Sequence, residues 1–316
     1  MTNSANDDRN LSSGTVAVSG AGGLIGSAVV KQLAESGMTV RRLVRSVENP
    51  AEDEIPWSVA DGILDAAKMS DVDHVVHLAG ETILGFWSEN KKRRIRDSRV
   101  NGARALSESL ALQTTRASQN SPLRTLICAS AIGYYGDRGG EILTEESAAG
   151  DGFLADVSRA WERATDPARE AGIRVVNLRI GVTLAKHGGT LKKMAPPFRL
   201  GLGGRLGDGK QYMSWVALKD VTRAISFLLK NESLSGPVNM TAPNPVTNGE
   251  FTSILGRILR RPTLITVPAF ALRLLLREQA NELFLTSQRV IPQKLMVAGF
   301  SFRHAEPEDA LRSLLS

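Results

Sequence analysis

The sequence predicts an α/β protein with a doubly wound parallel sheet and a smaller, mostly helical C-terminal domain that covers a cleft. Short apolar runs rich in β-branched residues alternate with helical stretches from residue 15 onward, which is typical of a parallel sheet. After Lys186 the composition becomes basic and glycine-rich, with Pro196-Pro197 as a break, which suits loops and short helices. A chain of 316 residues has room for both parts.

The first unit of this alternation carries a glycine motif. A strand is expected at 15–19 (TVAVS), a helix within GAGGLIGSAVVKQLAESG and a second strand at 39–45. The turn between them holds Gly20, Gly23 and Gly26, with Leu24 and Ile25 in the first turn of the helix. Glycines here permit a tight turn, a close approach to a pyrophosphate and contact of helix with strand. The pattern predicts dinucleotide binding, and the alternative is a glycine-rich turn without a ligand.

The end of the second strand indicates which dinucleotide is bound. A site for NAD usually has an acidic residue there, on the ribose 2′-hydroxyl. Here the residues are Arg45 and Ser46, and the next acid is Glu48. A guanidinium can bind a 2′-phosphate with two hydrogen bonds, so NADP(H) is favoured over NAD(H). The alternative is that Arg45 is only a surface residue.

The next strands extend the sheet toward the predicted ligand. The run 73–81 (DHVVHLAGE) ends in the small residues Ala79 and Gly80, followed by Glu81, as expected of a strand passing under a cofactor. Asp61 is a candidate for the adenine pocket or a turn residue. A helix over about 89–112 and strands at 124–130 and 174–184 follow.

Composition limits the other function classes. Cys128 is the single cysteine and lies in the apolar run TLICAS, which indicates a buried thiol, not a nucleophile, and excludes a disulfide framework. The four histidines are too scattered to predict a metal site. The net charge is +6 and its densest run is KKRRIRDSR at 91–99. That run indicates a solvated helix face more than nucleic-acid binding, with cofactor phosphates as a second interpretation.

Neither end of the chain predicts membrane attachment. Residues 1–14 are polar and read as a disordered tail, not a signal peptide. The run VPAFALRLLL at 267–276 contains an arginine and is too short to span a bilayer. We therefore expect a cytoplasmic protein.

The motifs GAGGLIG, HLAG, VNGAR, ASAIGYYG and LRIGVTL, in this order, resemble the extended short-chain dehydrogenase/reductase superfamily. More specifically, the phrases HLAGETI, SAIGYYGDRG, GDGFLADVSRAWE and TAPNPVTNGEF resemble its poorly characterised "epimerase family" branch of NAD-dependent epimerase/dehydratase-like proteins. The resemblance implies a Rossmann domain over 15–185 and about 216–242, and a small capping domain over about 186–215 and 243–316. It also implies NADP(H) along Gly20–Gly26, Arg45–Ser46, the Asp61 region and Ala79–Glu81. A homodimer is implied by resemblance alone.

One feature of that superfamily is missing. Typical members use a Ser or Thr to polarise the substrate oxygen, a Tyr to transfer the proton and a Lys four residues later to lower the tyrosine pKa. Ser130 matches the serine, but the helix after it offers either Phe153 and Val157 or Leu154 and Ser158. No lysine occurs between Lys92 and Lys186, so the Tyr–Lys pair is absent.

Three residues are candidates to replace that pair. Tyr135, in the turn after Ser130, is the first choice for the proton-transferring group, and stacking on the nicotinamide is its alternative role. Glu81 is the second choice, or a partner of a cofactor hydroxyl. Glu145 is the third, or a cap of the helix that follows it.

Basic residues outside the glycine motif are candidates for binding substrate. Arg179 ends the strand beginning at 174, where it can hold an anion or, as the favoured alternative, pair with Asp220. Arg199 and Arg205 lie in the basic segment after Lys186 and can bind a phosphorylated or nucleotide-linked substrate, or be exposed loop charges.

Two functions remain open. The first is an NADP(H)-dependent oxidoreductase or epimerase-like enzyme acting on a small polar or nucleotide-linked molecule. The second is a non-catalytic NADP(H)-binding sensor or regulatory protein. Ser130 and the capping region favour the enzyme, whereas the missing Tyr–Lys pair favours the sensor.

Overall fold

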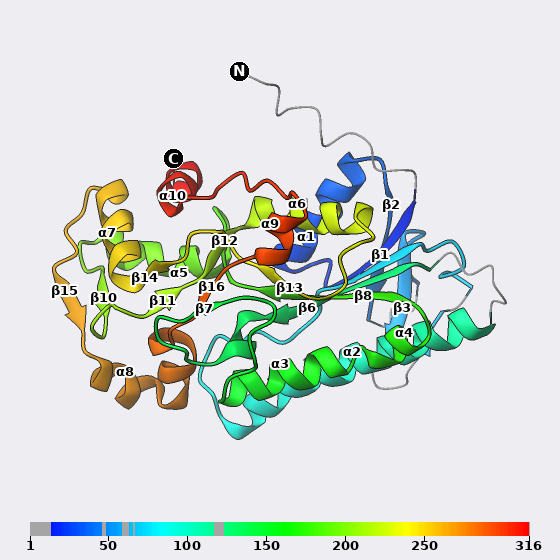
Figure 1. The fold of residues 1–316 in the computed structure, drawn as a ribbon, viewed down its shortest axis with the longest axis horizontal. Helices are drawn as coiled ribbons and strands as arrows, with labels where there is room; N and C mark the ends of the chain where they lie inside the picture. Colours follow the sequence, from blue (N-terminus) through cyan, green and yellow to red (C-terminus); the bar gives the residue numbers. More distant parts are fainter. Residues whose placement is uncertain (1–13, 46–48, 59–62, 66, 117–122, 316) are drawn as a thin grey trace, which may run out of the picture.

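The computed structural model describes residues 14–45, 49–58, 63–65, 67–116 and 123–315. Its centre is an eight-stranded sheet in the order β13-β8-β6-β5-β1-β2-β3-β4, in which all pairs are parallel except β3 with β4 (Figure 1). This confirms the doubly wound parallel sheet. The strands are β1 (Thr15–Ser19), β2 (Thr39–Val44), β3 (Glu54–Ser58), β4 (Ile63–Leu64), β5 (His74–His77), β6 (Thr125–Ala131), β8 (Arg174–Ile180) and β13 (Gly236–Met240).

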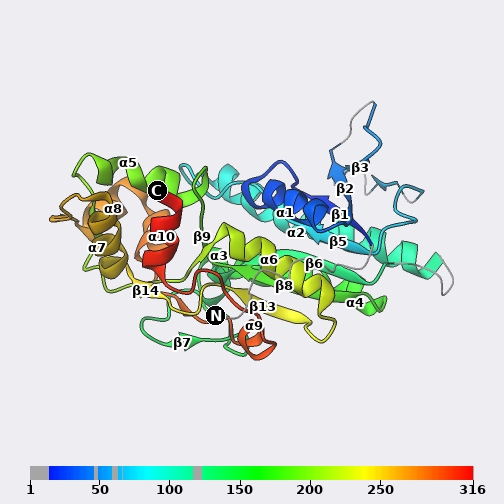
Figure 2. The ribbon, with the colours of Figure 1, turned by 90° about the horizontal axis from the view of Figure 1, so that it is seen from above.

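Alternate residues of the central strands form two separate cores, one on each face of the sheet. Val16 and Val18 of β1 pack under α1 and α6, whereas Ala17 joins the core beneath α2, α3 and α4. This period of two is expected of a sheet buried on both faces. Cys128 is buried in the second core, as predicted. Figures 1 and 2 show the covering helices α1 (Leu24–Glu35), α2 (Glu89–Arg116), α3 (Phe153–Arg163), α4 (Asp166–Glu170) and α6 (Leu218–Lys230).

The remaining elements form a smaller unit at one end of the sheet, around a third core that contains Trp215, Phe251 and Leu311 (Figure 2). The run predicted as one strand over 174–184 is interrupted at Gly181, where a Cβ would lie 2.6 Å from the carbonyl oxygen of Ser214. The strands of this unit and its margins are β7 (Ile142–Leu143), β9 (Val182–Leu184), β10 (Gly204–Leu206), β11 (Tyr212–Met213), β12 (Trp215–Ala217), β14 (Val246–Thr247), β15 (Ile265–Val267) and β16 (Arg289–Val290).

One helix of the smaller unit begins with a cap that the local sequence predicts. Thr247 and Glu250 form the capping box that their spacing predicts at the start of α7. Within the described residues, no helix combines the length and apolar character needed to cross a membrane. The helical elements are η1 (Ile132–Tyr135), α5 (Gly189–Arg199), α7 (Asn248–Leu259), α8 (Ala269–Leu276), the π-helix η2 (Ala280–Leu285), α9 (Gln293–Val297) and α10 (Pro307–Leu315).

A histidine is fully buried where β5 ends beside β1. The Nδ1 atom of His77 lies 2.6 Å from the hydroxyl of Ser19, and its Nε2 atom is buried without a hydrogen-bond partner. The ring also packs edge-on against Trp57. Because burial penalises the charged form, the pKa of His77 is lowered to about 4.

This histidine makes the fold sensitive to acid. The unfolded chain protonates His77 near pH 6.5, but the folded chain does so only near pH 4. Above pH 6.5, His77 therefore does not reduce the free energy of unfolding. As the pH falls from 6.5 to 4, it lowers the free energy of unfolding by up to about 3 kcal/mol. We expect His77→Phe to flatten the decline in the free energy of unfolding between pH 6.5 and 4, measured by urea denaturation. The exposed His187, changed to Gln, is the control, and equal slopes in both variants would contradict this account.

Candidate functional site

The glycine turn after β1 has almost no space for side chains. Gly20 has a φ of +70°, and a Cβ there would lie 2.8 Å from the backbone nitrogen of Ala79. A Cβ on Gly26 would lie 2.1 Å from the carbonyl oxygen of Gly20. Only glycine fits either position.

The helix that follows presents its N-terminus at this turn. α1 starts at Leu24 with Gly23 as its N-cap, and neither a capping side chain nor an acidic residue lies in its first turn. The N–H groups of the first turn and the helix dipole therefore favour an anion there. A Cβ on Gly22 would meet no atom within 4 Å, so the turn is open on that side.

A cavity of about 420 Å³ lies over this turn. Its walls combine the glycine turn, the end of β2 and the residues after β5. Arg45 is exposed at the end of β2 and lines the cavity, whereas Ser46 and Asp61 lie outside the described residues. The lining residues are Gly20, Ala21, Gly22, Gly23, Arg42, Leu43, Val44, Arg45, Trp57, Leu78, Ala79 and Gly80.

Several residues that line the cavity, including Arg42 and Trp57, were not predicted from the sequence. Arg42 carries a second guanidinium to the cavity, but its charge is compensated by Asp53 at 2.8 Å and Glu54 at 3.3 Å. Trp57 comes from β3. Its place at the cavity could not be predicted locally, because β3 pairs with β2 only in the folded chain. The tandem arginines 41 and 42 were the one local signal for a second basic group at this edge.

Glu81 follows the cavity-lining residues but is engaged elsewhere. Its carboxylate accepts a hydrogen bond of 2.6 Å from the ammonium of Lys91, which lowers the pKa of Glu81. Its carbonyl oxygen accepts from Arg99, which also lies over the ring of Trp161. Glu81 therefore stays ionised at neutral pH, which disfavours it as a proton donor. These contacts also show that part of the basic run 91–99 makes internal contacts.

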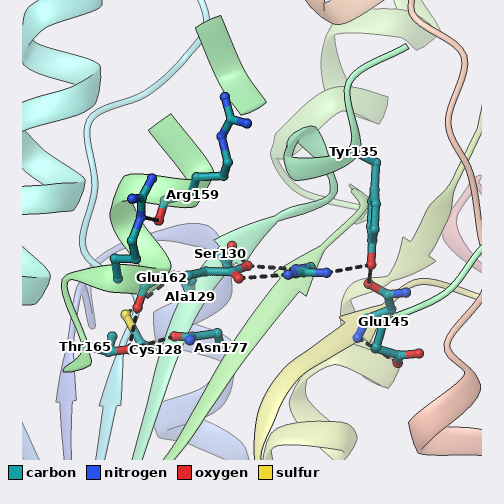
Figure 3. A network of polar contacts seen from close by, with 12 residues as sticks. Cys128, Ala129, Ser130, Tyr135, Glu145, Arg159, Glu162, Thr165 and Asn177 are labelled. Carbon is teal, nitrogen blue, oxygen red and sulfur yellow. Dashed lines mark hydrogen bonds and ion pairs between the residues drawn. The ribbon is translucent and has the colours of Figure 1, made fainter. Parts of the chain in front are cut away.

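Beyond the cavity, a buried ion pair joins the ends of β6 and β8 to α3 (Figure 3). The guanidinium of Arg179 donates to both carboxylate oxygens of Glu162, at 2.7 and 2.8 Å, and the Ser130 hydroxyl donates to the same carboxylate at 2.7 Å. The Arg179 and Glu162 side chains are 3% and 12% exposed. Ser130 is also buried, so its hydroxyl is directed to Glu162.

Tyr135 continues this network into the core. Its hydroxyl accepts from Arg179 at 2.9 Å and donates to Asn239 Oδ1 at 2.7 Å (Figure 3). It also lies 2.9 Å from the carbonyl oxygen of Thr144. The side chain is fully buried, and burial raises the pKa of Tyr135 to about 12. Both facts weigh against proton transfer at neutral pH. The neighbouring Tyr134 stacks on the guanidinium, whose carbon lies 3.5 Å from the ring centroid.

The favoured pairing of Arg179 with Asp220 is wrong. Arg179 lies at the end of β8 and meets α3, whereas Asp220 lies in the first turn of α6 on the opposite face of the sheet. The Asp220 carboxylate instead accepts from the backbone N–H groups of Arg303 and His304, at 2.8 and 2.9 Å. The Arg179 side chain is only 3% exposed, which weighs against direct contact with a substrate.

The predicted helix cap by Glu145 is also wrong. Its carboxylate accepts from the backbone N–H groups of Asn239 and Lys294, at 3.0 and 3.2 Å, so it caps α9 near the C-terminus. α3, the helix after Glu145, is capped by Glu282 instead, through the N–H groups of Phe153 and Leu154 at 3.0 and 3.1 Å.

The two basic candidates of the small unit lie apart from the cavity. Arg199 is exposed at the end of α5. Arg205 donates to the Thr266 hydroxyl at 3.0 Å and lines a separate, open groove of about 820 Å³ between α7, β15 and the start of α10. Among the residues placed by the structure, no cluster of three potential metal ligands occurs.

Fold and sequence together define the class of protein. Residues 16–240 match the NAD dependent epimerase/dehydratase family, and residues 267–314 match a domain of unknown function, DUF1731. The chain belongs to the NAD dependent epimerase/dehydratase family, as an atypical extended short-chain dehydrogenase/reductase.

Three individual relatives match almost the whole of this chain. The epimerase family protein Mb2239 of Mycobacterium bovis is 43% identical over 302 residues, which cover 95% of this chain and 97% of the relative. The crystal structure of human epimerase family protein SDR39U1 with NADPH matches with a TM-score of 0.82 at 28% identity, covering 95% and 98% of the two chains. A nucleoside-diphosphate sugar epimerase from Corynebacterium glutamicum matches with a TM-score of 0.78 at 38% identity, covering 96% of this chain and 58% of that one.

The buried ion pair predicts a large asymmetry between single and double substitutions. Glu162→Leu leaves the Arg179 charge buried without a partner, and we expect a loss of about 3 to 5 kcal/mol in the free energy of unfolding. The double variant Glu162→Leu/Arg179→Met removes both charges and should regain much of that loss. Urea denaturation of the single and double variants measures the coupling.

A matched control is the exposed pair of Arg104 and Glu108 on α2. Because water screens such a pair, Arg104→Met should cost at most about 0.5 kcal/mol. Additive losses at Glu162 and Arg179, with no recovery in the double variant, would show that the pair does not act as a unit.

Proposed function

We propose that the protein is an NADP(H)-dependent oxidoreductase or epimerase-like enzyme acting on a small polar or nucleotide-linked molecule. The observation that carries this proposal is the cavity over the glycine turn, with an uncapped helix N-terminus at its base and Arg45 at its rim. A pyrophosphate fits the first feature and a 2′-phosphate the second. The human relative SDR39U1 was solved with NADPH, which supports the same cofactor here.

The residues present fit such a dinucleotide. Gly20, Gly23 and Gly26 leave the space that its pyrophosphate needs, and the N–H groups of Leu24 and Ile25 lie at the start of the helix that faces it. Ala79 and Gly80 form the opposite wall, and Glu81 follows them. When bound, the nicotinamide would accept or supply the hydride. In this proposal Arg45 and Ser46 bind the 2′-phosphate, and Asp61 belongs to the adenine pocket.

Ser130 and Tyr135 enter this proposal as positioning residues. Both are buried and both contact the Glu162–Arg179 pair. They therefore hold the ends of β6 and β8 in place beneath the site and keep Tyr134 stacked on the guanidinium. Arg199 is exposed on the capping unit, where its charge can bind a substrate anion. Arg179 acts in this scheme by organising the site.

The second candidate function is a non-catalytic NADP(H) sensor. The observation that favours it is the first turn of α3, where Phe153 and Leu154 stand in place of a titrating side chain. Turnover of NADPH or NADP⁺ with a panel of carbonyl compounds and nucleotide sugars separates the two functions. An oxidoreductase consumes cofactor with at least one class of compound, whereas an epimerase returns the cofactor to its starting form and converts the compound into its epimer, which chromatography detects. A sensor binds both cofactor forms without turnover and changes its affinity for a partner protein between them.

Arg45 should decide between the two nicotinamide dinucleotides. We expect wild-type protein to bind NADPH at least roughly tenfold more tightly than NADH, a difference of about 1.4 kcal/mol. Arg45→Glu should abolish this preference, because it replaces a 2′-phosphate partner with a repelling charge. Isothermal titration calorimetry with both cofactors measures the change.

Arg104→Glu on α2 changes the net charge of the protein by the same amount at an exposed position distant in sequence from the cavity residues. It should leave the ratio of the two affinities unchanged. Equal binding of NADPH and NADH by wild-type protein would contradict the assignment of Arg45, and failure of both to bind would contradict the proposed function.

A further inference from the structure

A lysine from another helix lies beside the start of α3, although α3 itself has none. Lys92 is in the first turn of α2, and its ammonium lies 5.0 Å from the centroid of the Phe153 ring. Phe153 is the first residue of α3 and one of the positions that correspond to the missing tyrosine. The Lys92 side chain is 20% exposed, so its charge is sheltered but accessible.

Several contacts place this lysine at the ligand-binding edge of the sheet. Leu154, next to Phe153, packs close to Gly133 of η1, where an added Cβ would lie 3.1 Å from the Leu154 Cβ, and η1 directly follows β6. β6 pairs in parallel with β5, and the residues after β5 line the proposed cofactor cavity. The carboxyl ends of parallel strands meet at one edge, where ligands of doubly wound sheets bind. Trp87, just before α2, packs edge-on against Phe153 at 5.2 Å and closes the gap between the helices.

The C-terminal part of the smaller unit holds Lys92 in place. Glu278 accepts a hydrogen bond of 2.8 Å from the Lys92 ammonium. The next residue, Gln279, donates to the carbonyl oxygen of Ile83, and Glu282 caps α3. Glu278 and Glu282 flank the start of the π-helix η2, an irregularity frequently found at functional sites. The segment 278–282 therefore joins the starts of α2 and α3.

The contact between Lys92 and Glu278 favours the positively charged form of the lysine. The hydrogen bond that Lys92 donates to Glu278 is the main reason that the pKa of Lys92 is raised above its usual value. Glu89, at 3.7 Å from the ammonium, is almost fully exposed and screened by solvent. Such an ammonium is a poor proton donor at neutral pH, but it can stabilise negative charge that develops on a substrate oxygen.

We propose that Lys92, positioned by Glu278 from the C-terminal unit, is the positive charge of the reaction centre in place of the lysine that α3 lacks. The inference rests on the proposed NADP(H) function and specifies which residues face the nicotinamide end of the site. It also assigns a role to the region that matches a domain of unknown function, since Glu278 and Glu282 both lie within residues 267–314.

The charge difference between the two cofactor forms provides the test. The nicotinamide ring is cationic in NADP⁺ and neutral in NADPH, so a nearby ammonium disfavours NADP⁺ alone. Lys92→Met leaves the Glu278 carboxylate and should lower the ratio of the Kd for NADP⁺ to that for NADPH by roughly fivefold. Glu278→Gln leaves the ammonium unpaired and should raise the same ratio. Calorimetric titration with each cofactor form, at one ionic strength, measures both.

Two controls separate charge from structure. Lys92→Arg keeps the positive charge and should keep the wild-type ratio, even if it changes both affinities. Arg104→Met removes a positive charge twelve residues further along α2 and should not change the ratio. Thermal melting of every variant establishes that it is folded, and Lys92→Arg and Glu278→Gln preserve the test if Lys92→Met does not fold.

The outcomes are distinct. Opposite changes in the two variants support the proposal. An unchanged ratio in folded variants, or a change in the same direction in both, overturns it while leaving the cofactor assignment intact. Failure of wild-type protein to bind either NADP⁺ or NADPH overturns the proposed function and this inference together.

Discussion

The bidentate pair of Glu162 and Arg179 is the interaction on which the site end of the sheet depends. It joins a helix to a central strand, and Ser130 and Tyr135 add further hydrogen bonds to it. Desolvating two charges is costly, and only complete hydrogen bonding offsets that cost. Every group around the pair is therefore fixed by the need to satisfy it. This explains why two residues that look catalytic in the sequence are turned inward.

Two other carboxylates join the larger and the smaller unit by capping helices. Glu145, in the loop after β7, caps α9, and Glu282, in η2, caps α3. Each helix thus obtains the anion that its N-terminus favours from a distant part of the chain. The two units are joined by these reciprocal caps and by apolar contacts, since Leu295 and Phe300 pack into the core formed with α1 and α6.

Local pattern predicted the sheet, the glycine turn and the α7 capping box, because each depends on residues close together in sequence. It failed for Arg179 and Glu145, whose partners lie on elements brought together only by tertiary folding. The position of Lys92 beside the start of α3 could not be predicted for the same reason, because α2 and α3 meet only in the folded chain. Counting lysines along α3 correctly showed that none is present, but a count along one helix cannot show what a neighbouring helix and the C-terminal segment supply.

The pairing of β7 with β16 joins Ile142 to Arg289, almost half the chain apart. During synthesis, the strand near residue 142 leaves the ribosome long before its partner exists. At roughly 5 to 20 residues per second, that interval lasts on the order of ten seconds or more. Throughout it the start of α3 lacks its Glu282 cap and the first core lacks Leu295. Until these late residues emerge, the N-terminal part is therefore an incomplete unit with exposed apolar surface.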